Sequence, residues 1–318
     1  MDKIEYFRNK YGISTGLFAF NAFLVVAIVA VSFFIVVKES VSVVAQSKVE
    51  EKVVSTEMFD SLKLQAKAVY VYDINAKKVI FEKNSDVQLP LASLTKLMTA
   101  VTAMDLLPKD SDIVIKREFL LEEGDSGLLA NESWKLKDLL DFSLVSSSND
   151  GARSIASVIG AFGLETKDYD LGRKEFIVKM NAKAGQLGLK QTYFINESGL
   201  DVGTTSGGYG SAQDVEKLLE YILVKNPDIL EATKYTNISA VSDTQLHSAK
   251  NTNIDVAYIP GLLASKTGYT ELAGGNLAIA FDPTIGRPIA IVVLGSTIDG
   301  RFDDVNSLVR ASLEYVRE

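Results

Sequence analysis

The first strong pattern along the chain is an almost unbroken apolar run at residues 17–37, interrupted only by Asn21 and Ser32. At about 1.5 Å per residue, a helix of this length spans the roughly 30 Å hydrocarbon core of a bilayer. A cluster of basic residues precedes the run and the cationic excess falls away after it, as seen at Lys3, Arg8 and Lys10. By the positive-inside rule, residues 1–16 are expected in the cytoplasm and the remainder outside.

We therefore predict a single-pass membrane anchor at residues 17–37. The alternative is a cleaved signal peptide, because Val43-Val44-Ala45 could serve as a cleavage site, although the apolar region of such a peptide is usually shorter. Residues 38–63 are polar with scattered valines and contain neither Pro nor Gly, which predicts a partly helical stalk. Residues 64–318 are then the exported domain.

Period-two and helical patterns alternate within the exported domain. Two β-rich runs, 68–74 and 78–82, flank Asn75-Ala76-Lys77 and predict a hairpin. Helices are predicted at 91–107, 134–144, 151–159, 174–186 and 212–224, and strands at 261–269, 276–281 and 288–294, before a last helix at 301–317. Strands at both ends that enclose a helical middle predict an α/β (α+β) fold. Both chain ends then form one antiparallel five-stranded sheet, which is flanked by helices and carries an inserted helical subdomain.

Composition limits the chemistry that the chain can perform. The 318 residues are 47% hydrophobic and carry a net charge of −8, which argues against a nucleic-acid partner because phosphate binding needs a basic surface. There is no cysteine, and His247 is the only histidine. Disulfides, thiolate chemistry and a histidine-rich metal cage are thereby excluded, and we predict neither a metal site nor a cofactor.

Ser93 and Lys96 stand three residues apart at the start of the helix predicted at 91–107, just after Pro90. Residues at this spacing are neighbours on a helix, so the hydroxyl and the amine can meet. A serine is a poor nucleophile until a base removes its proton, and a neutral lysine can be that base. The pair alone is a weak signal, because a capping serine followed by a surface lysine explains it better.

Gly124-Asp125-Ser126-Gly127 matches the nucleophile motif of chymotrypsin-like proteases. That chemistry needs a histidine base and an orienting acid, and His247, the sole histidine, lies far downstream. We therefore interpret this segment as a turn.

Three short motifs follow one another in a known order: Ser93-x-x-Lys96, Ser147-x-Asn149 and Lys266-Thr267-Gly268. Together they are the set of class A β-lactamases and penicillin-binding proteins. From Ala66 to Val316 the chain resembles the serine D-alanyl-D-alanine carboxypeptidases, the low-molecular-mass penicillin-binding proteins. Further matching segments are Pro90-Leu91-Ala92-Ser93, Ser148-Asn149-Asp150, Asn196-Glu197-Ser198-Gly199-Leu200, Asn251-Thr252-Asn253, and Tyr269-Thr270 with Ala273-Gly274. Familiar members often carry a C-terminal β-rich domain and a terminal membrane helix. This chain stops at Glu318, so the N-terminal anchor is expected to serve instead.

The resemblance gives these residues roles in acyl transfer. Ser93 is expected to attack the carbonyl of the penultimate D-alanine, with Lys96 as the base. Burial and a second cation, Lys266, are expected to lower the pKa of Lys96. Ser147 is expected to relay a proton from Lys96 to the leaving amine, while the Asn149 amide holds a substrate peptide group.

The strand that carries Lys266 is expected to accept an extended peptide along its edge. Gly268 would leave room for the close approach of a backbone. The resemblance implies an oxyanion hole formed by the backbone N–H groups of Ser93 and Tyr269. Thr267 and Arg301 would bind the terminal carboxylate, although Arg301 could equally be a surface residue at a helix start.

The sequence thus predicts a membrane-tethered serine D-Ala-D-Ala carboxypeptidase that trims peptidoglycan stem peptides outside the cell membrane and is acylated by β-lactams. A β-lactamase on the same scaffold is disfavoured, since the Glu-x-x-Leu-Asn motif of class A enzymes is absent between Asn149 and Lys266. A non-catalytic peptidoglycan-binding protein is disfavoured because a binder needs no nucleophile–base pair. The sequence leaves open the preference for carboxypeptidase, endopeptidase or transpeptidase activity.

Overall fold

The computed structural model describes residues 58–124 and 126–317, together with isolated positions between residues 6 and 32. Residues Met58–Glu318 form one unit, which contains the domain predicted at 64–318. Most of the predicted anchor at 17–37 and most of the stalk at 38–63 lie outside the described residues. In the part of the chain that is described, no helix has both the length and the apolar character needed to cross a bilayer.

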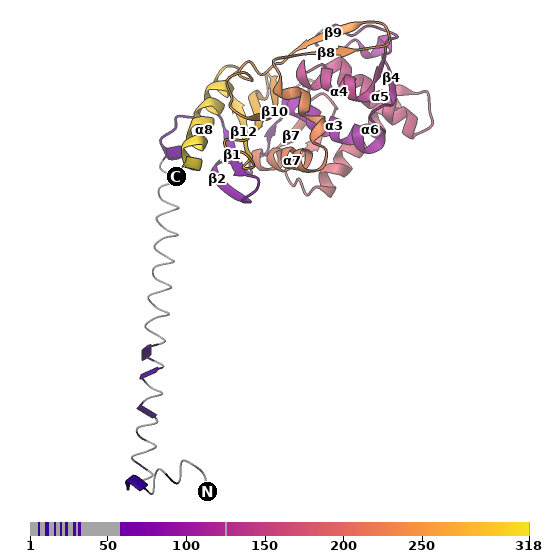
Figure 1. The fold of residues 1–318 in the computed structure, drawn as a ribbon. Coiled ribbons are helices and arrows are strands. Elements are labelled where there is room, and N and C mark those ends of the chain that lie inside the picture. Colours follow the sequence, from indigo (N-terminus) through magenta and orange to yellow (C-terminus); the bar gives the residue numbers. More distant parts are fainter. Residues whose placement is uncertain are drawn as a thin grey trace. The chain divides into compact units, whose positions relative to one another are not determined.

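Both ends of this unit contribute to one antiparallel sheet, as the sequence predicts (Figure 1). Its strand order is β10-β11-β12-β1-β2. Strand β12 joins the C-terminal strands to the N-terminal hairpin, because it pairs with β11 on one side and with β1 on the other. Ala68 of β1 stands opposite Leu294 of β12. The bounds are β1 Ala68–Asp73, β2 Lys78–Lys83, β10 Leu262–Thr270, β11 Gly274–Phe281 and β12 Ile289–Ser296.

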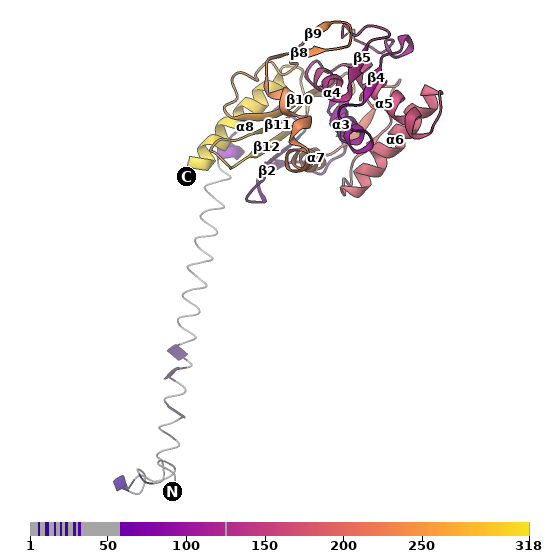
Figure 2. The same cartoon turned by 45° about the vertical axis from the view of Figure 1, so that its right-hand side comes forward.

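Both faces of the sheet are covered, which explains why all of β12 is buried and why it is apolar from Ile289 to Leu294. Alternate side chains, such as those of Val69 and Val71, pack with α8, Gly300–Arg317, on one face. Their neighbours Ala68 and Tyr70 pack against the helical middle of the chain on the other face. Figures 1 and 2 show α8 on one side of the sheet and α3 to α7 on the other.

The helical middle is inserted between β2 and β10. Its helices are α3 Thr95–Leu106, α4 Leu136–Val145, α5 Asn149–Gly163, α6 Tyr169–Gln186 and α7 Ala212–Lys225. Single 3₁₀ turns lie at η1 Ala92–Leu94, η2 Arg117–Phe119, η3 Pro227–Ile229 and η4 Glu231–Lys234. Short strands pair at β3 Leu89–Pro90, β4 Asp112–Val114, β5 Ser133–Lys135, β6 Tyr193–Phe194, β7 Gly208–Gly210, β8 Asn237–Val241 and β9 Leu246–Lys250.

Two helix starts differ from the prediction. Pro90 belongs to β3, and Ser93 lies in η1, so the α-helix begins only at Thr95. Trp134, predicted as helical, pairs with Ile113 in a short ladder and is fully buried. A large aromatic side chain fits a strand position as well as a helix position, and here tertiary packing decides.

The sequence analysis missed the hairpin of β8 and β9, which runs alongside α4 (Figures 1 and 2). His247 fastens this hairpin, because its Nε2 lies 2.8 Å from Glu132 Oε1. Its ring also packs against Trp134 in a tilted arrangement, with 4.8 Å between centroids. The only histidine therefore has a structural environment.

Candidate active site

The three motifs meet at a cleft between the edge strand β10, the turn η1 and the loop that joins α4 to α5. Most of the residues predicted for the site line it, namely Ser93, Ser147, Asn149, Thr267, Gly268, Tyr269 and Arg301. A larger groove elsewhere is bordered by Leu223, Pro227 and Leu263 and offers no nucleophile–base pair. No cluster suited to a metal ion occurs among the described residues. The smaller cleft is therefore the candidate active site.

Ser93 and Lys96 are brought into contact by the change from 3₁₀ turn to helix. Lys96 Nζ donates to Ser93 Oγ at 2.9 Å. The same amine donates to Asn149 Oδ1 at 2.7 Å and to the carbonyl oxygen of Ser198 at 2.8 Å. Ala92, just before the serine, adopts a left-handed conformation with φ 48°, a strain typical of functional sites.

Lys96 is 2% exposed, and burial lowers its pKa to about 7. The negative charges of Glu197 and Glu122 oppose this effect by stabilising the ammonium form. A large fraction of Lys96 is therefore neutral near pH 7 and can accept the Ser93 proton.

Lys266 lies on β10 with its amine directed to a different serine. Its Nζ donates to Ser147 Oγ and to the Thr267 carbonyl oxygen, both at 2.9 Å. Burial lowers its pKa well below the usual value, and the positive charges of Lys96 and Arg301 lower it further. The sequence analysis expected Lys266 to keep Lys96 neutral. In the structure burial is the largest cause that lowers the pKa of Lys96, and the positive charge of Lys96 contributes to lowering the pKa of Lys266.

The loop after α4 positions Ser147 and Asn149 differently from expectation. Ser147 has φ 60° and contacts Lys266, whereas no hydrogen bond joins it to Lys96 among the described contacts. Asn149 accepts from Lys96, and its Nδ2 donates to the Glu123 carbonyl oxygen at 2.6 Å. The amide oxygen and one of its two N–H groups are therefore bound to the protein, and the second N–H is the donor that the expected contact with a substrate peptide group would use.

Gly268 allows β10 to approach η1. A Cβ atom at this position would lie 2.8 Å from the Leu91 carbonyl oxygen and 3.2 Å from the Ser93 nitrogen. Only glycine fits such a contact without displacing backbone. The two residues predicted for the oxyanion hole, Ser93 and Tyr269, lie on the segments that meet here, and both line the cleft.

Arg301 comes from the first turn of α8 and lies under β10 rather than on the surface. It is 8% exposed, and its Nη1 donates to the Gly268 carbonyl oxygen at 2.8 Å. Its Nε has no hydrogen-bond partner among the described residues. Thr267 lines the same cleft and lies 2.6 Å from Thr252, Oγ1 to Oγ1. A guanidinium with unused donors beside a hydroxyl suits a carboxylate.

The protease-like Ser126 is not brought near the histidine. Its Oγ lies 2.7 Å from Ser148 Oγ, whereas His247 contacts Glu132. Ser148 also caps α5 by accepting from the Gly151 N–H. Ser126 and His247 therefore do not form a Ser-His pair of the chymotrypsin type.

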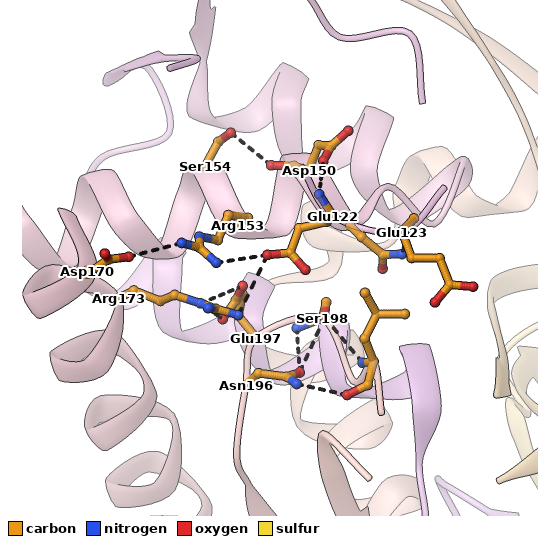
Figure 3. A network of polar contacts seen from close by, with 12 residues as sticks. Glu122, Glu123, Asp150, Arg153, Ser154, Asp170, Arg173, Asn196, Glu197 and Ser198 are labelled. Atoms are coloured by element: carbon orange, nitrogen blue, oxygen red, sulfur yellow. Dashed lines mark hydrogen bonds and ion pairs between the residues drawn. The ribbon is translucent and has the colours of Figure 1, made fainter. Parts of the chain in front are cut away.

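Sequence reasoning missed a group of charged residues behind the cleft: Glu122, Arg153, Arg173 and Glu197 (Figure 3). Glu197 lies within the segment 196–200 that strengthened the resemblance, but no pattern pointed to its partner Arg173 on α6. Spacing along the sequence reveals contacts within one helix, whereas this ion pair joins α6 to the segment that follows β6.

Comparison with known proteins agrees with this geometry. The family model described as D-alanyl-D-alanine carboxypeptidase, peptidase S11, matches residues 52–297. D-alanyl-D-alanine carboxypeptidase DacF of Bacillus subtilis (strain 168) is 31% identical over 252 residues, which cover 77% of this chain and 61% of that protein. The D-alanyl-D-alanine endopeptidase of Escherichia coli (strain K12) is 32% identical over 235 residues, 70% of this chain and 69% of that one.

Among solved structures, penicillin-binding protein D2 of Listeria monocytogenes in its ampicillin-bound form superimposes with a TM-score of 0.67 at 27% identity. The match covers 79% of this chain and 98% of that one. The likeness therefore extends over nearly the whole of that structure, and the match to the Bacillus relative spans less than two thirds of its length.

Proposed function

Because the chain belongs to the D-alanyl-D-alanine carboxypeptidase family of serine peptidases, we propose that it cleaves the terminal D-Ala-D-Ala bond of peptidoglycan stem peptides through an acyl-enzyme on Ser93. One observation carries the proposal. The Lys96 amine lies 2.9 Å from the Ser93 hydroxyl in a buried pocket that lowers its pKa to about 7. A nucleophile and a base that is neutral at working pH are thus held in contact.

The reaction begins when Ser93 Oγ attacks the carbonyl carbon and its proton moves to Lys96 Nζ. The oxyanion that forms accepts hydrogen bonds from the N–H groups of Ser93 and Tyr269, each worth about 3–4 kcal/mol. When the C–N bond breaks, the D-alanine amine takes up the proton held by Lys96, which restores the neutral base. Lys266 donates to Ser147 Oγ and so leaves that hydroxyl hydrogen free to point at the leaving group. Water then hydrolyses the ester and restores Ser93.

Two features of the cleft favour a peptide with a free C-terminus. Strand β10 lies at an edge of the sheet, so its outer side can pair with an extended peptide. Arg301 and Thr267 both line the cleft, and a guanidinium and a hydroxyl suit a terminal carboxylate. Carboxypeptidase activity is therefore proposed ahead of the endopeptidase activity named for the Escherichia coli relative.

A β-lactamase would need a carboxylate that activates water beside the acyl-enzyme. Glu197-Ser198-Gly199-Leu200-Asp201 differs from Glu-x-x-Leu-Asn only at its last residue. The Glu197 carboxylate is nevertheless fully buried, bound to Arg173, and does not line the cleft. Penicillin is therefore expected to acylate Ser93 and to leave slowly, in keeping with the ampicillin-bound relative.

Intact-protein mass spectrometry after exposure to penicillin tests this proposal. One long-lived adduct is expected, absent in Ser93→Ala, together with D-alanine release from an acylated peptide ending in D-Ala-D-Ala. Rapid turnover of the drug would move the assignment to a β-lactamase. Absence of both adduct and D-alanine release would favour a binding protein that retains the fold.

We propose further that the catalytic unit acts on the outer side of the cell membrane, tethered by residues 17–37. Support comes from the apolar run and the basic residues before it. Protease added to spheroplasts is expected to digest the catalytic unit and to spare the first residues of the chain. Recovery of a soluble mature form that begins near Gln46 would show that the segment is a cleaved signal peptide.

A further inference from the structure

We propose that Glu197 and Arg173 form a positioning ion pair that holds the Lys96 amine against Ser93 and supplies a fixed negative charge beside it. This inference rests on the proposed function. Neither residue lines the cleft, so both act through Lys96 rather than on the substrate.

The Lys96 amine is surrounded by three hydrogen-bond acceptors. Besides Ser93, the amine contacts Asn149 Oδ1 and the Ser198 carbonyl oxygen. An amine on four flexible carbons is held in place only where its acceptors are themselves fixed. The question is therefore what holds Ser198 and Asn149.

Ser198 is held by the ion pair. Arg173 Nε donates to both carboxylate oxygens of Glu197, at 3.0 and 2.8 Å, and Glu197 is 0% exposed. The Glu197 backbone carbonyl also accepts from Thr99 Oγ1 at 2.7 Å, which ties this segment to α3 one turn beyond Lys96. The residue next to Ser198 is thus fixed through its side chain and through its backbone.

Ser198 also lies within a tight turn that runs from Asn196 to Gly199. Asn196 Oδ1 accepts from the N–H groups of Ser198 and Gly199, at 3.2 and 2.7 Å. Gly199 has φ 82°, and a Cβ there would lie 1.9 Å from the Ala92 carbonyl oxygen. The turn therefore packs directly on the residue that precedes the nucleophile.

Asn149 is held by the segment that contains Glu122 and Glu123. Its Nδ2 donates to the Glu123 carbonyl oxygen, while the Glu122 carboxylate lies 2.8 Å from Arg153 and 3.9 Å from Arg173. Figure 3 shows the Glu122 carboxylate between the two guanidinium groups, with Arg173 reaching on to Glu197. One network therefore supports both acceptors of the Lys96 amine.

The network also determines the charge that Lys96 experiences. The negative charges near Lys96 are those of Glu197 and Glu122, which pair with Arg173 and Arg153. Asp170 contacts Arg153, and Asp150 accepts from the Glu122 N–H. The positive charges are those of Lys266 and Arg301. Burial lowers the pKa of Lys96, and Glu197 followed by Glu122 counteract that shift. Without Glu197, less base would be protonated at a given pH, but the amine would lose a fixed neighbour.

Substitutions that separate charge from geometry test the proposal, with penicillin acylation measured between pH 5 and 9. Glu197→Gln keeps the shape and removes the charge, so the midpoint of the pH profile is expected about one unit lower. The ratio of the rate at pH 6 to the plateau rate is then expected to be about five-fold larger in the variant than in the wild type. Arg173→Lys keeps the charge but loses the fork, so the plateau rate is expected to fall about ten-fold with an unchanged midpoint.

Asp73→Asn is the matched control, because Asp73 is a fully buried carboxylate that Arg287 contacts at 2.8 Å, near the sheet end away from Gly268. It is expected to lower thermal stability and to leave the midpoint in place. An unchanged midpoint in Glu197→Gln, or an equal shift in Asp73→Asn, would overturn the proposal. Glu122→Gln is expected to shift the midpoint in the same direction by less, and covers the case of a Glu197→Gln protein that does not fold. A wild type that penicillin does not acylate would instead overturn the proposed function.

Discussion

Replacing Lys266 by glutamine tests the order in which the two buried lysines lose their protons. The lowering of the Lys96 pKa from 10.5 to about 7 corresponds to about 5 kcal/mol against the ammonium form. Burial accounts for this shift in the pKa of Lys96. The ammonium form of Lys266 is disfavoured by burial and also by the positive charges of Lys96 and Arg301. Because the charges of Glu197 and Glu122 favour the ammonium form of Lys96, we expect Lys266 to lose its proton first and to be neutral when Lys96 titrates.

It follows that Lys266→Gln leaves the midpoint of acylation within about 0.3 units of the wild-type value, near pH 7. The plateau rate is nevertheless expected to fall about 100-fold, because Ser147 loses the donor that orients its hydroxyl. This outcome differs from the expectation drawn from the sequence, in which the loss of a second cation raises the pKa of Lys96.

Stopped-flow acylation by a chromogenic cephalosporin between pH 5 and 9 measures both quantities. Below its midpoint the wild-type rate is expected to fall about ten-fold per pH unit, since the protonated base is inactive. Lys96→Arg serves as the inactive reference, because a guanidinium stays protonated throughout this range. A midpoint for Lys266→Gln near pH 8 or higher would refute the reasoning, since it would mean that Lys266 is charged while Lys96 titrates.

Three further results are expected. Gly268→Ala places a Cβ 2.8 Å from the Leu91 carbonyl oxygen and is expected to slow acylation at least about 100-fold; Gly163→Ala, which meets no atom within 4 Å, is expected to leave it unchanged. Glu216 is 2% exposed, and burial followed by the charge of Glu220 raises its pKa to about 8. The folded protein then loses stability as pH rises from 4.5 to 8, so Glu216→Gln is expected to add about 3 kcal/mol to the unfolding free energy at pH 7 and nothing near pH 4, by denaturant titration. Arg301→Gln is expected to raise the KM for a D-Ala-D-Ala peptide about 100-fold with a smaller change in kcat; an unchanged KM would contradict its role at the carboxylate.

The sheet and the last helix could be predicted from the sequence because their patterns are dictated by burial. Strand β12 is apolar from Ile289 to Leu294 since both faces are covered, and α8 shows one apolar stripe because only one side packs. Trp134 was placed in the wrong element because burial, not helical spacing, explains its apolar character. The hairpin of β8 and β9 escaped notice because its buried positions hold Ala240, His247 and Ala249 rather than large apolar residues, while Val241 and Leu246 are exposed.

The reactive residues of the site could be proposed from sequence because three short motifs each place two reactive groups near one another. Which of these groups contact one another could not be predicted from the sequence. Lys96 and Lys266 each reach a different serine, and the Asn149 amide contacts Lys96 and the Glu123 carbonyl oxygen. These contacts depend on where β10 and the loop after α4 meet in space, and residue spacing within each motif carries no information about that meeting.

The placement of β12 between β11 and β1 has a consequence for biogenesis. Ala68 opposite Leu294 is a contact between residues made near the beginning and near the end of synthesis of this unit. Contacts of such large sequence separation form slowly, because the whole intervening chain must be confined before they contribute. Until β12 emerges, β1 exposes an unpaired hydrophobic edge, which is the kind of surface that aggregates and recruits chaperones. A chain truncated after Phe281 would retain Ser93, Lys96 and Lys266 yet lack the strand that joins the two parts of its sheet, so no reactive serine is expected before translation of the unit is nearly complete.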